Sequence, residues 1–237
     1  MDVHLTVMGS SPAWPNPGSA HSGYLVEAQG ALLLDCGPGV LARLRERENH
    51  AVDAIAITHF HLDHWGDLVP WAWLAAYGPD AGNPRPELWV PPDGVQALHH
   101  FASLWGNDGM FERAFDLREF EREIRFEAAG FEVEAVPVAH YDLDAFGFRV
   151  SSGGKTLAYS GDSGPCRPLS DLARGADLFV CEATLGSADA DGPLRGHLTA
   201  NEALAAADGP TVLTHRPVEL PEPEGVPLAY DGFTLQM

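Results

Sequence analysis

Four side chains that can bind a divalent metal stand within six residues, in the run His59-Phe60-His61-Leu62-Asp63-His64. An apolar run at residues 55–58 precedes them and predicts a strand that ends where the motif begins. Side chains alternate along extended backbone, so His59 and His61 are expected on one side, and the following turn brings Asp63 and His64 to a second position. An open zinc site usually takes three protein ligands, so four ligands predict the start of two sites ~3.5–4 Å apart. A histidine-rich surface loop is the alternative interpretation.

Two metals need further ligands, and three later candidates each follow an apolar run that is typical of a strand. These are His140 after residues 136–139, Asp162 after residues 157–161, and His215 after residues 212–214. Taken alone, each histidine could be a hydrogen-bonded side chain at a loop edge, and the aspartate could belong to a turn. Their shared position favours one common site, because a strand end holds a side chain rigidly. Imidazole and carboxylate ligands suit zinc, while manganese and iron accept similar sets.

The elements that must position these residues follow from short apolar runs that alternate with helical patterns. Strands are expected at residues 5–8, 24–27, 31–34, 55–58, 88–90, 131–138, 146–150, 156–160, 178–181, 212–214 and 233–236. Helices are expected at residues 38–47, 68–77, 94–105, 169–174 and 199–207, with a loop at 78–86. The acidic stretch 107–130 stays unassigned. This interleaving without strict βαβ regularity predicts two mixed sheets covered by helices, in one domain spanning residues 1–237.

Composition narrows the classes of function. The 237 residues carry 34 acidic and 14 basic side chains, a net charge of −20 that opposes binding to a long polyanion. No apolar stretch is long enough for a membrane span, and the N-terminus shows no secretory signal pattern. Three distant cysteines without a CxxC pair do not indicate a disulfide scaffold, which makes the cytoplasm the expected compartment.

These residues resemble the metallo-β-lactamase superfamily over nearly the whole chain. The matching segments are Thr58–His64, the Asp35-Cys36-Gly37 turn, Tyr159-Ser160-Gly161-Asp162-Ser163 and Leu213-Thr214-His215. The resemblance implies an α/β (α+β) fold, a four-layer αββα sandwich with metals at the sheet ends. It also implies that His59, His61 and His140 hold one metal, that Asp63, His64 and His215 hold the other, and that Asp162 bridges them.

Two further motifs are similar to the ribonuclease Z branch of this superfamily. They are Cys181-Glu182-Ala183-Thr184 and Gly196-His197-Leu198-Thr199-Ala200, and the resemblance assigns Glu182 and His197 to catalysis rather than to metal binding. Independently, Thr199 and Glu202 fit a capping box, so His197 precedes a helix N-terminus, which favours a phosphate anion. The alternative is that Glu182 and His197 form a structural hydrogen-bonded pair.

The chain departs from the tRNA-processing members of that branch. Those enzymes carry a projecting arm, which the common bacterial form inserts between the positions of His140 and Asp162. Here residues 141–161 are filled by two expected strands and the Ser152-Gly153-Gly154 turn. The segments Ser22-Gly23-Tyr24-Leu25 and 172–177 are instead similar to the arm-less cyclic-nucleotide phosphodiesterases of the branch.

We therefore expect a dinuclear, metal-dependent phosphodiesterase that hydrolyses a phosphodiester of a small nucleotide. Zinc is the first expected metal, and a 3′,5′-cyclic nucleotide is the first expected substrate. In this hypothesis a metal-bridging hydroxide attacks, Asp63 orients it, and His197 protonates the leaving oxygen while Glu182 holds its ring. A tRNA 3′-processing endonuclease of the ribonuclease Z type is the alternative. A non-catalytic metal-binding module is a third interpretation, which the complete set of ligands and the Glu182/His197 pair disfavour. The family leads us to expect a homodimer.

Three tryptophans near the metal motif, Trp65, Trp71 and Trp73, have two interpretations. One of them could stack on a nucleobase, because aromatic faces do so without sequence preference. Packing in the core or a dimer interface is the favoured interpretation, since residues 71 and 73 of a helix face different directions.

Overall fold

The computed structural model of the chain describes residues 2–79, 81–122 and 124–237. Three residues lie outside this part. Residue 1 is the N-terminus, residue 80 belongs to the predicted loop 78–86, and residue 123 belongs to the unassigned stretch 107–130. The strands are β1 (His4–Gly9), β2 (Gly23–Glu27), β3 (Ala31–Leu34), β4 (Ala54–Ala56), β5 (Glu87–Val90), β6 (Asp116–Glu119), β7 (Arg125–Ala128), β8 (Phe131–His140), β9 (Leu143–Ser152), β10 (Lys155–Tyr159), β11 (Leu178–Glu182), β12 (Thr211–Thr214) and β13 (Thr234–Gln236). The helices are α1 (Val40–Arg45), α2 (Leu62–Trp65), α3 (Leu68–Tyr77), α4 (Gly94–Leu104), α5 (Met110–Ala114), α6 (Arg167–Ala173) and α7 (Ala200–Ala206), with a 3₁₀ turn η1 (Ala188–Asp191).

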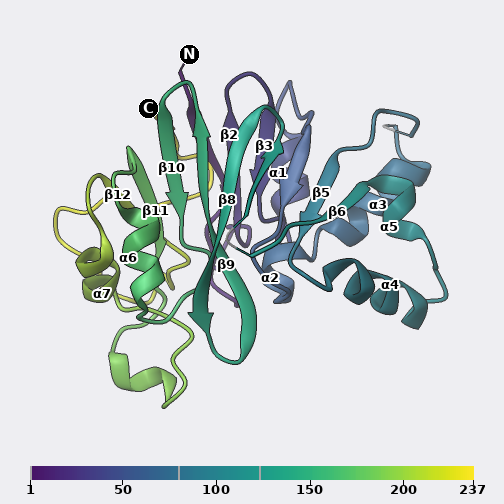
Figure 1. The fold of residues 1–237 in the computed structure, drawn as a ribbon. Coiled ribbons are helices and arrows are strands. Elements are labelled where there is room, and N and C mark those ends of the chain that lie inside the picture. Colours follow the sequence, from purple (N-terminus) through teal and green to yellow (C-terminus); the bar gives the residue numbers. More distant parts are fainter. Residues whose placement is uncertain (1, 80, 123) are drawn as a thin grey trace.

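The strands form two mixed sheets. One has the order β13-β1-β2-β3-β4-β5-β6 and the other β12-β11-β10-β9-β8-β7. Helices α1 to α5 lie beside the first sheet, and α6 and α7 lie against the second (Figure 1). This is the metallo-β-lactamase α/β sandwich that the sequence predicts.

Alternation along the strands builds three hydrophobic layers. In β3, Leu32 and Leu34 belong to the core between the sheets, whereas Leu33 packs under the helices. In β11, Val180 faces the core between the sheets and Phe179 faces α6 and α7. Strands buried on both faces read as continuous apolar runs, which explains why the sequence predicts them without clear alternation.

The predicted strand 31–34 and helix 68–77 coincide with β3 and α3, while other bounds shift. Strands β8 and β9 are longer than predicted, because their pairing continues to His140 opposite Leu143 beyond the apolar runs. Helix α1 is shorter than predicted, since Gly39 before it adopts a left-handed φ of 96°. The unassigned stretch contains α5, β6 and β7. The residues of the two strands are mostly polar and exposed, so their sequence shows no strand pattern.

The strand directions bring the motifs to one edge. Strand β1 is antiparallel to β2 and β2 to β3, while β4 is parallel to β3. The carboxyl ends of β1, β3 and β4 therefore lie at the same edge, where the segments after Gly9, Leu34 and Ala56 begin. Within the described residues, no helix combines the length and the apolar character needed to cross a membrane.

Candidate metal centre and active site

Three histidines converge as the first group of metal-ligand candidates. His59 Nε2 lies 3.2 Å from His61 Nδ1, which lies 2.9 Å from His140 Nε2. Nitrogens bound to one tetrahedral zinc at ~2.0–2.1 Å stand roughly 3.3–3.4 Å apart, so this spacing suits a shared cation. Asp162 completes the group, and all four ligand atoms lie within 4.8 Å of one another.

Asp63, His64, Asp162 and His215 form a second group of the same compactness. Asp63 Oδ2 lies 3.2 Å from His215 Nε2 and 3.5 Å from His64 Nε2. Asp162 belongs to both groups, with its Oδ2 3.3 Å from His64 Nε2 and 3.9 Å from both His59 and His140 Nε2. The structure thus brings together all seven ligand candidates in the two sets that the resemblance implies.

The chain turns sharply to present Asp162. Gly161 adopts a left-handed φ of 57°, and a Cβ there would lie only 2.6 Å from the Phe146 carbonyl oxygen. His215 also has a left-handed backbone, with φ 52°. A non-glycine residue in this region costs free energy, and such strain clusters at functional sites.

Hydrogen bonds behind the imidazoles fix their orientation. The Nδ1 atoms of four histidines meet an outer partner: His59 meets Thr58 Oγ1 (3.0 Å), His64 meets Asp35 Oδ2 (2.7 Å), His140 meets the Gly196 carbonyl (2.7 Å) and His215 meets Thr184 Oγ1 (2.9 Å). The carboxylate and the carbonyl only accept, so the His64 and His140 rings carry a proton on Nδ1. Their Nε2 lone pairs are then free to face a metal, as in known metal sites.

Two buried atoms of this cluster are consistent with a bound cation. Among the described residues, His64 Nε2 and Asp162 Oδ1 are buried without a hydrogen-bond partner. Buried polar atoms are normally satisfied, so each such atom needs an explanation. A divalent ion held by this imidazole and carboxylate set would satisfy both.

The pKa shifts of three of these groups favour the forms that bind a metal. Burial lowers the pKa of His140 to about 4, and burial also places the pKa of His59 well below its ordinary value. Burial opposes ionisation of Asp162, but electrostatic interaction with the surrounding imidazoles, His215 and His64 first, outweighs it and holds the pKa of that carboxyl well below its usual range. Neutral His59 and His140 beside an ionised Asp162 are the forms that bind a metal.

Glu182 and His197 meet at the edge of this cluster. His197 Nδ1 lies 3.0 Å from Glu182 Oε1 and 3.9 Å from Asp162 Oδ2. Oxygens of Glu182 also accept backbone N–H groups from Ser163 and Leu198, so the carboxylate is fixed on several sides. Burial alone would lower the pKa of His197, yet the hydrogen bond and charge of Glu182 outweigh it and raise the pKa to about 9.

The predicted capping box is present behind His197. Thr199 Oγ1 accepts the Glu202 N–H at 3.3 Å, and Glu202 Oε2 accepts the Thr199 N–H at 2.9 Å. Glu202 is further held by Arg195 at 2.8 Å. The start of α7 is therefore rigid, and it anchors the segment that carries His197.

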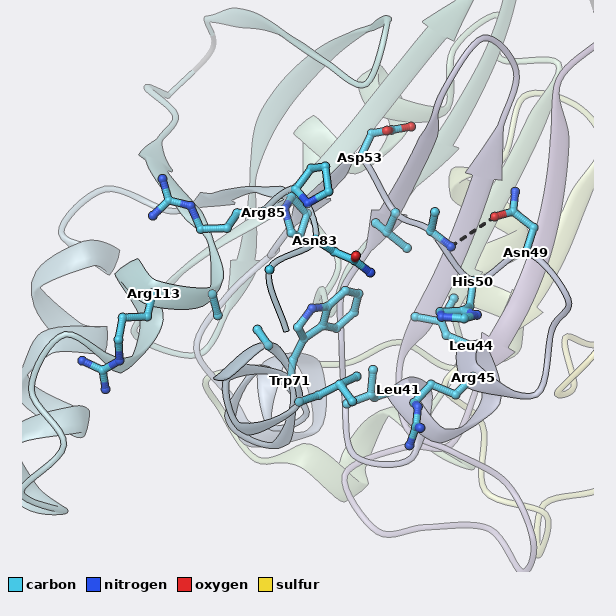
Figure 2. Close-up of a pocket in the computed structure, with 18 of the residues that line it drawn as sticks. Leu41, Leu44, Arg45, Asn49, His50, Asp53, Trp71, Asn83, Arg85 and Arg113 are labelled. Atoms are coloured by element: carbon cyan, nitrogen blue, oxygen red, sulfur yellow. Dashed lines mark hydrogen bonds between the residues drawn. The ribbon is translucent and has the colours of Figure 1, made fainter. Parts of the chain in front are cut away.

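The three tryptophans of the sequence prediction pack against other side chains. Trp65 is buried and donates to the Phe60 carbonyl, whereas Trp73 is exposed and stacks on Tyr77. Trp71 reaches into a cavity of about 740 Å³ between α1, α3 and the segment 82–86 (Figure 2). The residues that line this cavity include Asp53, before β4, so it lies at the other end of that strand from His59.

A different tryptophan stands on a segment that is bonded to the backbone just beyond His215. Trp14, half exposed, belongs to the segment between β1 and β2. Pro12 in this segment accepts a hydrogen bond from His21, and the side chain of Asn16 bonds the Arg216 carbonyl and the Val218 N–H, just beyond His215. Trp14 therefore lies between two anchor points beside the site.

Sequence reasoning missed several residues that shape the site. Asp35 accepts from His64, and Thr184 contacts both His215 and Glu182. Two motifs carry a signal, the Asp35-Cys36-Gly37 turn and the Cys181-Glu182-Ala183-Thr184 segment, but neither motif gives a role to the Asp35 carboxylate or the Thr184 hydroxyl. Tyr141 and Trp14 gave no signal, because their importance depends on contacts distant in sequence.

Comparison with known proteins agrees with this geometry. Residues 31–215 match the model of the β-lactamase superfamily domain, and the chain belongs to this family. An uncharacterised protein of Mycobacterium tuberculosis is 32% identical over 92% of this chain and 82% of its own length. A ribonuclease Z of Mycolicibacterium paratuberculosis is 31% identical over 75% of this chain and 69% of its own.

A solved structure gives the same fold. The metallo-β-lactamase fold protein YhfI of Bacillus subtilis superposes with a TM-score of 0.85 at 23% identity, over 100% of both chains. The chain thus lies in the ribonuclease Z-like branch of the metallo-β-lactamase superfamily. It is a metallo-β-lactamase-fold hydrolase related to ribonuclease Z, with a His/Asp cluster that indicates divalent-metal binding.

Proposed function

We propose that this protein is a dinuclear metal-dependent phosphodiesterase that hydrolyses a small nucleotide, a 3′,5′-cyclic nucleotide above all. The observation that carries the proposal is the Glu182–His197 pair, 3.0 Å apart and adjacent to Asp162. Hydrolysis of a phosphodiester expels an alkoxide, which needs a proton, and His197 stands beside the ligand cluster to give one.

The residues present would hold two ions, zinc being the first expectation. His59, His61 and His140 would bind one, the set Asp63, His64 and His215 the other, and Asp162 both. Such ions would supply Lewis-acidic stabilisation of the phosphoryl oxygens and a water acidic enough to attack near neutral pH.

The protein side chains then perform the remaining steps. Burial opposes ionisation of Asp63, but its hydrogen bond with His215 and the nearby His64 imidazole outweigh it and lower the pKa of the carboxyl, so that Asp63 can orient the attacking water. As the water oxygen bonds to phosphorus, the bond from phosphorus to O3′ breaks. His197 Nε2 donates its proton to O3′, since Nδ1 faces Glu182, and the product is a 5′-monophosphate.

Two features favour a small substrate over tRNA. Between His140 and Asp162, a segment that the structure describes completely, the chain forms only β9, β10 and their short connections. The net charge of −20 also opposes a polyanionic partner. The ribonuclease Z relative supports the second candidate, a tRNA 3′-processing endonuclease, which we keep as the alternative.

The test is the conversion of 3′,5′-cyclic AMP to AMP by zinc-loaded protein, with His197→Ala beside it. We expect turnover in the wild type and a loss of about 10²-fold or more in the variant at equal metal content. Absence of turnover in metal-replete wild type, together with cleavage of precursor tRNA, would contradict the proposal and support the endonuclease. Loss of metal in parallel with activity would refute the proton-donor role of His197.

A further inference from the structure

The backbone that carries His197 is held by a side chain from the preceding 3₁₀ turn, η1. Asp191, at the end of η1, accepts the N–H of Gly196 at 2.7 Å and the N–H of His197 at 3.0 Å, both through Oδ2. Two hydrogen bonds to one carboxylate oxygen fix the direction in which this part of the chain runs. The placement of the proposed proton donor therefore depends on where Asp191 itself is held.

Tyr141, the residue after β8, holds Asp191 in turn. Its hydroxyl donates to the other carboxylate oxygen, Asp191 Oδ1, at 2.7 Å. Tyr141 directly follows the ligand candidate His140 and has a left-handed φ of 51°, a conformation that is strained for a residue with a bulky side chain. The strained backbone aims the ring at the segment 191–197 instead of along the β8–β9 hairpin.

The ring of Tyr141 also packs on the segment that it ties down. Its centroid lies 4.8 Å from that of His140 and 5.8 Å from that of His197. A Cβ on Gly196 would stand 2.4 Å from the tyrosine ring, so a glycine is required beneath it. The Gly196 carbonyl in turn accepts from His140 Nδ1 at 2.7 Å. The contacts thus run from Tyr141 through Asp191 to the backbone of His197, and return from Gly196 to His140.

We infer that Tyr141 and Asp191 are positioning residues that lock His197 against the end of β8, so that its Nε2 meets the leaving oxygen of the substrate. The inference rests on the proposed function of this site and deepens it. Glu182 fixes the direction of the imidazole within its own plane, whereas Tyr141 and Asp191 fix the backbone from which the ring projects. Without this pair, His197 keeps its hydrogen bond to Glu182 but is no longer held at a fixed position relative to the substrate phosphorus.

Leaving-group chemistry separates this role from a merely structural one. A ribose alkoxide is a strong base and departs only with a proton, whereas nitrophenolate is weakly basic and departs without one. A misplaced His197 therefore slows hydrolysis of a cyclic nucleotide and spares that of bis(p-nitrophenyl) phosphate. General damage to the fold or to metal binding slows both reactions equally.

The experiment compares Tyr141→Phe and Asp191→Asn with wild type, all loaded with zinc, on 3′,5′-cyclic AMP and bis(p-nitrophenyl) phosphate. We expect kcat for the cyclic nucleotide to fall by about 10- to 100-fold, with kcat for the nitrophenyl diester within about threefold and metal content unchanged. Matched controls remove the same atoms elsewhere. Tyr77→Phe lies at the exposed end of α3, and Asp189→Asn lies in the same η1 turn, so both are expected to keep wild-type rates on both substrates.

A second measurement is independent of turnover. Hydrogen exchange of the Gly196 and His197 amides is expected to be about 10-fold faster in Tyr141→Phe than in wild type, because their acceptor is released. Equal losses on the two diesters, or unchanged exchange at both amides, would overturn the inference. If wild type cleaves neither diester, the proposed function fails, and amide exchange alone then decides whether Tyr141 positions this segment.

Discussion

His64 and Asp35 form a fully buried pair, with His64 Nδ1 2.7 Å from Asp35 Oδ2. Asp35 has a left-handed φ of 59°, and its carboxylate also accepts from the Thr58 N–H, the Thr58 hydroxyl and the Tyr159 hydroxyl. One side chain thus organises β3, β4 and β10 at the point where the ligand groups meet. Its charge holds the Nδ1 proton on His64 and points the other ring nitrogen toward Asp63 and Asp162.

We expect Asp35→Asn to weaken zinc binding by about 10- to 100-fold, because partners that orient metal-bound imidazoles have effects of this size. An amide cannot match the carboxylate as an acceptor for His64 and for three other donors at once. Competition titration of the purified protein with a chromophoric chelator measures the change.

The matched control is Asp53→Asn. Asp53 accepts the Ala31 N–H at the other end of β4 and is expected to leave zinc affinity unchanged. Equal zinc affinity in wild type and Asp35→Asn would show that His64 is oriented without this partner, or that it does not bind the metal.

Metal removal is expected to lower the melting temperature. The site gathers two carboxylates and five imidazoles, most of them buried, and a bound ion would satisfy polar atoms that otherwise lack partners. At free zinc 100-fold above the dissociation constant, binding stabilises a protein by about 2.7 kcal/mol, which corresponds to a shift of roughly 5–10 °C for a chain of this length. Differential scanning fluorimetry with EDTA, and then with excess zinc, tests this.

Calcium prefers all-oxygen ligands and is not expected to restore the lost stability. His59→Ala should abolish the zinc-dependent shift, whereas His99→Ala, on the exposed surface of α4, should keep it. A zinc shift that survives in His59→Ala would place the stabilising ion elsewhere.

The pH dependence of turnover should report the pairing of Glu182 with His197. The pKa of His197 is raised to about 9, so its proton-donating form prevails below that pH and is lost as the pH rises through it. Cations bound beside Asp162 oppose this rise, and the alkaline limb of kcat is therefore expected between the ordinary pKa of histidine and about 9.

Glu182→Gln removes the negative charge that raises this pKa, so the alkaline limb of kcat should move to lower pH. A full profile of kcat against pH measures the shift, and Asp177→Asn, which loses an ion pair with Lys155 away from the site, is the control. An alkaline limb at the same pH in Glu182→Gln would mean that another group supplies the proton.

Several of the ligand candidates could be located from sequence because they stand at the ends of buried strands. Apolar runs locate strands; His59 and Asp162 stand three positions beyond β4 and β10, and His215 directly follows β12. The distance between the ends of β4, β10 and β12 does not follow from such runs, since it depends on which strands pair. The resemblance supplied only the sandwich fold with metals at the sheet ends, and the two mixed sheets confirm that fold.

The residues that surround the ligands could not be predicted in this way. Asp191 stands in a short polar turn that resembles any solvated loop, and only the folded chain shows that it binds Tyr141, fifty positions earlier. The tryptophans illustrate the same limit. Proximity to the metal motif in sequence singled out Trp65, which is buried against Phe60 and Phe101. Trp14 instead stands on a segment whose Asn16 bonds residues 216 and 218, just beyond His215.

Trp14 is expected to contribute to recognition of a nucleobase. Its half-exposed indole stands on a segment that is anchored at Pro12 by His21 and at Asn16 by the backbone after His215. Stacking of a base on an aromatic side chain is worth about 1–3 kcal/mol, so Trp14→Ala should raise KM for 3′,5′-cyclic AMP by roughly 5- to 100-fold with little change in kcat. Steady-state kinetics of the zinc-loaded variant gives both constants.

Two comparisons make the effect specific to stacking at this position. Trp14→Phe keeps a flat aromatic face and should recover most of the affinity, while Trp105→Ala removes a similarly exposed indole at the end of α4 and should change neither constant. A cyclic ribose phosphate without a base should be bound equally by wild type and Trp14→Ala, because this ligand has no base that could stack on the indole of Trp14. If Trp14→Ala lowers kcat and leaves KM unaltered, the indole supports the catalytic geometry, and base recognition must come from other side chains.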